Sequence, residues 1–153
     1  MLLLTIVPVA PLRATPAHKS EMVSQLLFGE TAEQLAEEGD FYLVKCSYDG
    51  YEGWIQKRQT TRLNETPDYQ GWVAKSEEIV FLNDHPQTVP PGSVLPANGH
   101  FAAGPYQCAC AIKVDLLSSH HWPVKGEEVV HWAKQYLGAA YLWGGVGRGK
   151  SML

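Results

Sequence analysis

Residues 39–55, GDFYLVKCSYDGYEGWI, decide the fold that the sequence predicts. After an opening Gly-Asp turn, the aromatic and apolar run over 41–46 has the composition of a strand. Asp49-Gly50 is a strong hairpin signal, and residues 51–55 have the composition of the returning strand. The stretch therefore predicts an antiparallel β-hairpin.

The sequence before this hairpin predicts further short strands. Residues 4–7 are apolar and β-branched and end at prolines, residues 13–21 are a polar exposed loop, and residues 23–28 are again apolar. Residues 30–38 are rich in Ala, Glu and Gln, which by intrinsic propensity favour a helix. Together with the hairpin, these segments form a first β unit over 1–60.

A second and less clearly marked β unit is predicted over 61–123, after a polar linker at its start. Short apolar runs occur around 72–73 and 79–82, and another spans 107–117 beyond a proline-rich turn at 88–92. Three tryptophans are expected in the core of the protein: Trp54, Trp72 and Trp143.

The pattern changes to a helical one over 126–137. Apolar residues recur there at three- and four-residue spacing, acidic residues fill the first turn, and Gly138 follows the end. One helix beside two β units has little to pack against, so we expect its apolar side chains to be partly exposed. We assign 124–153 to the start of a third, incomplete domain.

Composition excludes several classes of function. The 153 residues are 45% hydrophobic and 18% charged, which is typical of a globular protein. The net charge of −4 provides no basic surface for nucleic acid or anionic membranes, so we expect neither as a partner. The N-terminal MLLLTIVPVAPLRA lacks a basic segment and contains two prolines, so we interpret it as a strand rather than a signal peptide and expect a cytoplasmic protein.

Three cysteines cannot form a closed set of disulfides. Cys108 and Cys110 would face the same side of a strand, and a zinc site would need two further ligands that are not found nearby. We favour buried free thiols and expect neither a metal nor an organic cofactor.

Residues 144–151, GGVGRGKS, fit the phosphate-binding pattern G-x-x-x-x-G-K-[ST]. That pattern acts only between a strand and a helix whose N-terminus faces the phosphates, and two residues follow Ser151 here. A nucleotide-binding protein is therefore the third and least favoured of our functional hypotheses.

The run over 39–55 resembles a bacterial SH3-like (SH3b) module, in which residues 30–38 would be a strand despite their helix propensity. The longer string VPVAPLRATPAHKSEMVSQLLFGE looks like the first SH3b module of NlpC/P60 cysteine peptidases of the dipeptidyl-peptidase VI type, which are γ-D-glutamyl-L-diamino acid endopeptidases. This resemblance implies a mainly β chain of two small SH3-like barrels, followed by one helix that begins an incomplete α+β papain-like peptidase domain.

The catalytic residues of the family are not in this sequence. The family pattern YLGxxYxWGG, matched by residues 136–145, leads there to a D-C-S-G-F motif whose cysteine at a helix N-terminus is the nucleophile, with a histidine further on. The 153 residues contain no such motif, so we expect them to be inactive alone.

Three residues match family positions with a role at the substrate. Tyr141 matches a tyrosine of the active-site wall, with an aromatic packed beneath the loop as the alternative. Glu21 and Tyr51 match positions that meet a cell-wall-derived peptide with a free N-terminal L-alanine, where a carboxylate and a phenol suit an ammonium group. The alternatives are a solvated loop charge and a surface aromatic.

The leading hypothesis is thus the substrate-binding N-terminal region of a cell-wall-peptide cysteine endopeptidase. The alternative is a non-catalytic SH3b binding module for cell-wall peptide or protein. The sequence leaves the oligomeric state undetermined.

Overall fold

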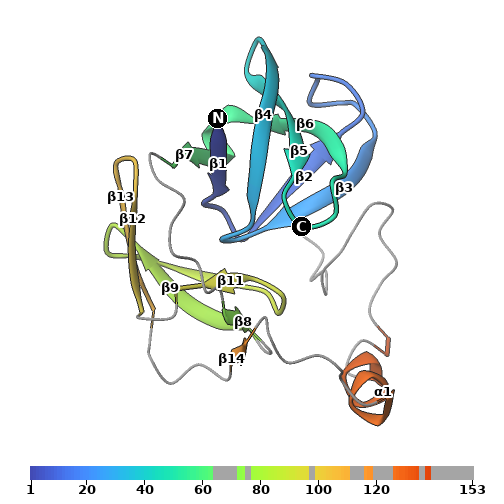
Figure 1. Cartoon of the computed structure of the whole chain (residues 1–153), viewed down its shortest axis with the longest axis vertical. Helices are drawn as coiled ribbons and strands as arrows, with labels where there is room; N and C mark the ends of the chain where they lie inside the picture. The colour runs from blue at the N-terminus through green and yellow to red at the C-terminus, as the bar shows by residue number, and fades with distance from the viewer. Residues whose placement is uncertain are drawn as a thin grey trace.

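The computed structural model describes residues 1–63, 72–74, 77–96, 99–110, 116–118, 126–134 and 137–138. Three antiparallel sheets and one helix make up these parts of the chain (Figure 1). The predicted mainly β class is therefore confirmed.

The first β unit is a seven-stranded sheet in the order β3-β2-β6-β5-β4-β1-β7. Its strands are β1 Leu2–Thr5, β2 Val9–Arg13, β3 Met22–Leu27, β4 Thr31–Glu38, β5 Phe41–Cys46, β6 Glu52–Gln56 and β7 Thr60–Arg62. Side chains from all strands but the last pack in one buried cluster, because the sheet curls around it: Leu3, Ala10, Leu12, Leu26, Ala32, Val44, Cys46 and Ile55.

The predicted hairpin is present as β5 and β6, with Lys45 paired to Glu52 next to the turn. Gly50 has φ +73°, a conformation that glycine adopts without strain. The strand predicted over 30–38 is also confirmed, since β4 pairs with both β5 and β1. Tertiary pairing therefore outweighs the helix propensity of this segment.

In the first unit one strand was not predicted and one expectation is wrong. The first strand ends before the prolines, as expected, because β1 stops at Thr5, but the unpredicted strand β2 includes Pro11 between two buried residues. The ladder of β2 to β6 consists of the Arg13–Trp54 pair, so the proline interrupts no continuous ladder there. Trp54 is only half-buried, because strand alternation points its neighbours Gly53 and Ile55 to the core and the tryptophan to the other face.

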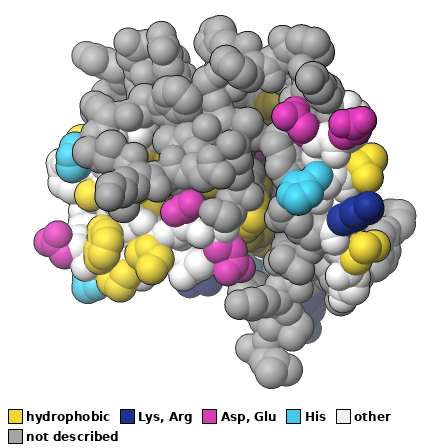
Figure 2. Space-filling view, turned by 90° about the horizontal axis from the view of Figure 1, so that it is seen from below, with side chains coloured by type: hydrophobic (Ala, Val, Ile, Leu, Met, Phe, Trp, Pro, Cys, Tyr) yellow, Lys and Arg dark blue, Asp and Glu magenta, His cyan; other side chains and the backbone are white. Residues whose placement is uncertain are grey.

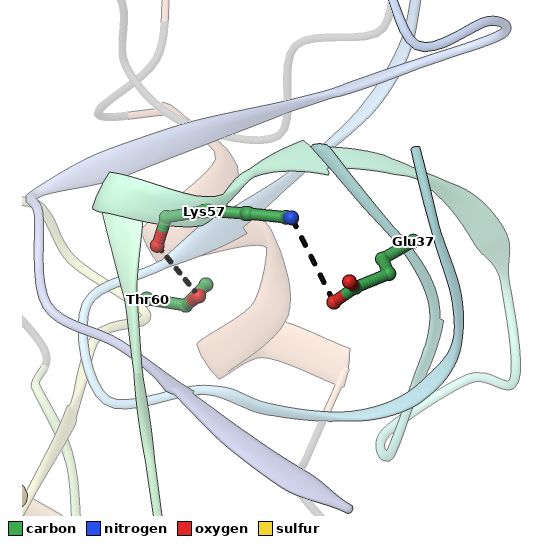
Figure 3. A network of polar contacts seen from close by, with 3 residues as sticks. All are labelled: Glu37, Lys57 and Thr60. Atoms are coloured by element: carbon green, nitrogen blue, oxygen red, sulfur yellow. Dashed lines mark hydrogen bonds and ion pairs between the residues drawn. The ribbon is translucent and has the colours of Figure 1, made fainter. Parts of the chain in front are cut away.

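A short 3-10 helix, η1 Lys57–Gln59, connects β6 to β7 and is tied to the β4–β5 hairpin (Figure 3). The Lys57 Nζ lies 3.7 Å from a carboxylate oxygen of Glu37 and 5.1 Å from the centre of the Tyr42 ring. The Thr60 hydroxyl donates to the Lys57 carbonyl at 3.1 Å. Because these groups are partly exposed, the ion pair itself adds little stability.

The second β unit consists of two sheets. One has the order β10-β9-β13-β12 and the other β11-β8-β14. Their strands are β8 Trp72–Ala74, β9 Glu78–Leu82, β10 His85–Val89, β11 Val94–Leu95, β12 His100–Ala103, β13 Tyr106–Cys110 and β14 Leu116–Ser118. Strands β10, β11 and β12 were not predicted. All three lie at sheet edges, where a proline such as Pro86 in β10 is tolerated.

The two units share one hydrophobic core, which the sequence did not predict. Leu4, Ile6 and Phe28 of the first unit pack in the same buried cluster as residues of the second unit, among them Val80 and Leu95. The backbones also meet, since the Val94 N–H donates to the Phe28 carbonyl at 2.8 Å. The first unit therefore packs directly against the second.

Helix α1 Gly126–Lys134 begins where predicted and stands apart from the strands (Figure 1). Val130 of this helix is 52% exposed and Leu137, beyond its last residue, is 77% exposed, which confirms the expected incomplete cover of these two side chains. Figure 2 shows this exposed surface at its right, where acidic, basic and hydrophobic side chains lie side by side. In the part of the chain that the structure describes, no helix is long and apolar enough to span a membrane.

We expect that adding one methyl group at Gly29, by substitution with alanine, disrupts the contact between the two units. A Cβ added there would lie 1.9 Å from the Val94 carbonyl oxygen, and the residue has φ +81°. Gly29→Ala should lower the free energy of unfolding by about 3–5 kcal/mol, whereas Gly39→Ala, with positive φ but open space around it, should cost about 1–2 kcal/mol. Equal losses in urea denaturation would contradict the close junction.

Candidate functional site

Glu21 lies at the end of an ordered loop between β2 and β3. The Arg13 guanidinium Nη1 donates to the Ser20 carbonyl at 2.7 Å, and the Thr15 N–H donates to the Ser20 hydroxyl at 2.9 Å. The Ala14 N–H donates to the Glu21 carbonyl at 3.0 Å. This bond uses the backbone of Glu21, and its side chain is exposed. The loop therefore presents a carboxylate to solvent from a fixed backbone.

Tyr51 lies immediately before β6, after the Asp49-Gly50 turn. Its N–H donates to a carboxylate oxygen of Asp49 at 2.9 Å, and its carbonyl accepts from the Cys46 N–H at 2.9 Å. The side chain is 44% exposed. The turn thus fixes the backbone of Tyr51 and leaves the ring accessible to a ligand.

Arg13, the last residue of β2, lies between the strand that follows Glu21 and the strand that follows Tyr51. It pairs with Met22, the neighbour of Glu21, on one side and with Trp54 on the other. Adjacent strands are about 4.8 Å apart and residues about 3.3 Å apart along a strand, so the backbones of Glu21 and Tyr51 are on the order of 10–15 Å apart. Two long side chains and one short peptide can bridge that distance.

The third candidate, Tyr141, lies outside the described residues, as do Trp143 and the whole of GGVGRGKS. The side chain of Trp72 is likewise outside the description. These predictions stay predictions.

A hollow of about 230 Å³ at the junction of the two units was not predicted. Its lining combines apolar, hydroxyl and acidic groups: Leu26, Gly29, Glu30, Thr31, Ser47, Tyr48 and Val94. A carboxylate oxygen of Glu30 accepts from the Leu27 N–H at 2.7 Å. Burial raises the pKa of Glu30 above its ordinary value, the Leu27 hydrogen bond opposes the rise, and the nearby Asp49 adds to it.

Sequence alone could not single out Glu30, because it stands in a stretch where Glu and Gln are common and mostly exposed. The position becomes special only when Val94 of the second unit covers the adjacent Gly29. The carboxylate ties down the end of β3, which is a sufficient structural role for it.

The cysteines are buried free thiols, as predicted. Cys108 and Cys110 face the same side of β13 and pack in the core shared by the two units. Burial raises the thiol pKa of both Cys46 and Cys108 to about 12 and raises that of Cys110 as well. A nucleophilic cysteine needs the opposite shift, so these three thiols cannot supply one. Among the described residues, no group of three His, Cys, Asp or Glu side chains could hold a metal ion.

Two comparisons with known proteins found similarities to this chain. Residues 12–59 match the family model of the bacterial dipeptidyl-peptidase SH3 domain. The crystal structure of an NlpC/P60 family protein from Bacillus cereus ATCC 10987 is similar with a TM-score of 0.76 and 16% identity, over 96% of this chain and 67% of that one. At this identity the likeness shows the fold alone. No curated protein sequence matches the chain.

Residues 12–59 are therefore similar to the SH3 domain of bacterial dipeptidyl-peptidases, and the fold is similar to that of the NlpC/P60 family protein. Both Glu21 and Tyr51 lie within the matched residues 12–59.

We expect Glu30→Gln to reveal the buried charge through the pH dependence of stability. Because the pKa of Glu30 is raised on folding, its contribution to stability is present below the unfolded pKa and is lost as pH rises through the folded pKa. Wild type should therefore lose stability relative to Glu30→Gln between about pH 4 and pH 7. Urea denaturation at both pH values tests this, with the exposed Glu33→Gln as control; a difference that stays constant would contradict it.

The thiols should be unreactive in the folded protein. With a pKa near 12, roughly one Cys46 or Cys108 side chain in 10⁴ is a thiolate at pH 8. Iodoacetamide should therefore modify native protein at least about 100-fold more slowly than protein unfolded in guanidinium, measured by mass spectrometry. Rapid labelling of one cysteine in the native state would show that its surroundings are more open than described.

Proposed function

We propose that this chain is the substrate-binding N-terminal region of a cell-wall-peptide cysteine endopeptidase of the dipeptidyl-peptidase VI type. In this proposal, residues 1–60 and 61–123 are tandem SH3b modules that form one wall of the substrate site. Residues 124–153 begin the peptidase domain, with Tyr141 on its wall. The protein acts in the cytoplasm on peptides released during peptidoglycan recycling.

The observation that carries the proposal is an exposed carboxylate and an accessible phenol that directly precede the two strands pairing with Arg13, inside the residues that match the bacterial dipeptidyl-peptidase SH3 model. The Arg13 guanidinium donates to the Ser20 carbonyl, and among the described residues the ion pair found is Lys57–Glu37, which does not involve Glu21. A carboxylate of this kind pairs with the N-terminal ammonium of an L-alanyl peptide, and the Tyr51 hydroxyl can accept a further hydrogen bond from it.

The alternative is a binding module that holds such peptides without hydrolysis. The observation in its favour is the burial of all three thiols, which removes every cysteine of these 153 residues from nucleophilic chemistry. Both proposals use the same peptide-binding site. They differ in whether the gene also encodes a catalytic domain. A D-C-S-G-F motif encoded just after Leu153, in frame or shifted, would decide for the peptidase.

Binding of L-Ala-γ-D-Glu-L-Lys should depend on its N-terminal charge. Titration followed by amide NMR should show saturable shifts near Glu21 and Tyr51 that vanish with the N-acetylated peptide. Glu21→Gln should weaken binding by about 5- to 10-fold, the loss of one charged hydrogen bond at an exposed site. Tyr51→Phe should weaken it less, because the hydrogen bond it removes involves a neutral hydroxyl.

Matched controls come from the same unit. Glu33→Gln removes an equal charge from an exposed position on β4, and Tyr48→Phe removes an exposed hydroxyl from the same turn as Tyr51. If the acetylated peptide binds as well as the free one, the proposed amine site is wrong. Fusion to an intact NlpC/P60 peptidase domain provides a second test, since Glu21→Gln should then also lower cleavage of the free peptide relative to the acetylated one.

A further inference from the structure

The loop that carries Glu21 is closed at its base by a small network around Ser20. The carbonyl of Ser20 accepts from the Arg13 guanidinium at 2.7 Å, and its hydroxyl accepts from the Thr15 N–H at 2.9 Å. Its own N–H donates to the Ala17 carbonyl at 3.0 Å. Ser20 thus uses its backbone donor, backbone acceptor and hydroxyl within the loop, directly before Glu21.

The tip of the loop is held separately. The ring of His18 lies edge-on to the ring of Phe41, with centroids 5.1 Å apart. Phe41 is buried at the start of β5 and is a firm support. Pro16, between these two attachments, restricts the backbone further.

The strand geometry beside the loop is irregular in a way that affects Glu21. The register of β2 and β3 shifts between Leu12, which pairs with Ser24, and Arg13, which pairs with Met22. Val23 is therefore an extra residue of β3 without a partner in β2, which makes it a β-bulge. A bulge bends its strand, so this one changes the direction of the start of β3, next to Glu21. Arg13 stands opposite this bulge and reaches the loop with its side chain.

We infer that Arg13 and Ser20 are positioning residues that fix the loop of residues 14–21 so that Glu21 meets the ammonium group of the peptide, an inference that rests on the proposed function. Holding a loop in its binding conformation raises affinity because less conformational entropy is lost on binding. Neither residue needs to touch the peptide. Their contribution is to the direction and rigidity of the backbone at Glu21.

The charge of Arg13 allows a sharp test, because two effects have opposite signs. A cation near Glu21 repels the ammonium group, so electrostatics alone predicts that Arg13→Met binds the peptide more tightly. Positioning predicts the reverse, a loss of about 3- to 10-fold. Arg13→Lys retains a cationic donor and should recover part of the affinity.

Ser20→Ala tests the same inference without a change of charge and keeps it testable if Arg13→Met does not fold. It should weaken binding of L-Ala-γ-D-Glu-L-Lys, while Ser20→Thr, which retains the hydroxyl, should not. Thr15→Ala is the matched control, because it removes a loop hydroxyl and leaves the Thr15 N–H bond in place. The unfolding midpoint in urea should change little in these exposed-loop variants.

Amide exchange provides a readout that is independent of the peptide. The N–H groups of Ala14 and Thr15 are bonded to Glu21 and Ser20 respectively, so both should exchange faster in Arg13→Met, and Thr15 also in Ser20→Ala. Faster exchange together with weaker binding supports the inference. Three results would overturn the inference and leave the proposed function standing. These are faster exchange with unchanged affinity, unchanged exchange in the variants, and tighter binding of the peptide by Arg13→Met. A wild type that does not prefer the free peptide over the acetylated one overturns both.

Discussion

The contact between Phe28, Gly29 and Val94 is the constraint on which the arrangement of this protein depends. The Val94 N–H donates to the Phe28 carbonyl, and the Val94 carbonyl oxygen occupies the space where any other residue at position 29 would carry its Cβ. Phe28 is buried in the core that both β units share. A backbone bond, a missing side chain and a buried ring thus hold the two β units together.

At the junction of the two units, apolar residues at the ends of β1 and β3 pack against the second unit. The loop before β3 and the turn before β6 remain open, and Arg13 links them through its two strand partners and its guanidinium. The amine site that we propose at this place is bordered by a sheet on one side and by a hydrogen-bonded loop on the other, a support that suits the recognition of a small charged group.

The cysteines show why residue type alone does not indicate chemistry. Three thiols in a chain that resembles a cysteine peptidase invite a catalytic assignment, yet all three are buried and two have a pKa near 12. They act here as small apolar side chains that fill cores. None of the three is therefore poised to act as a nucleophile in this region.

The sequence by itself determined the elements whose information is local. The Asp49-Gly50 hairpin, the alternation that buries Cys108 and Cys110, and the start of α1 all follow from turn chemistry and side-chain periodicity. Resemblance, not propensity, identified β4, and the candidates Glu21 and Tyr51 came from it too. Tertiary structure alone decided that Pro11 lies in a strand, that Trp54 faces outward, that Glu30 lines a hollow and that the two units share a core. These features depend on which distant segment covers which face, and no local pattern carries that information.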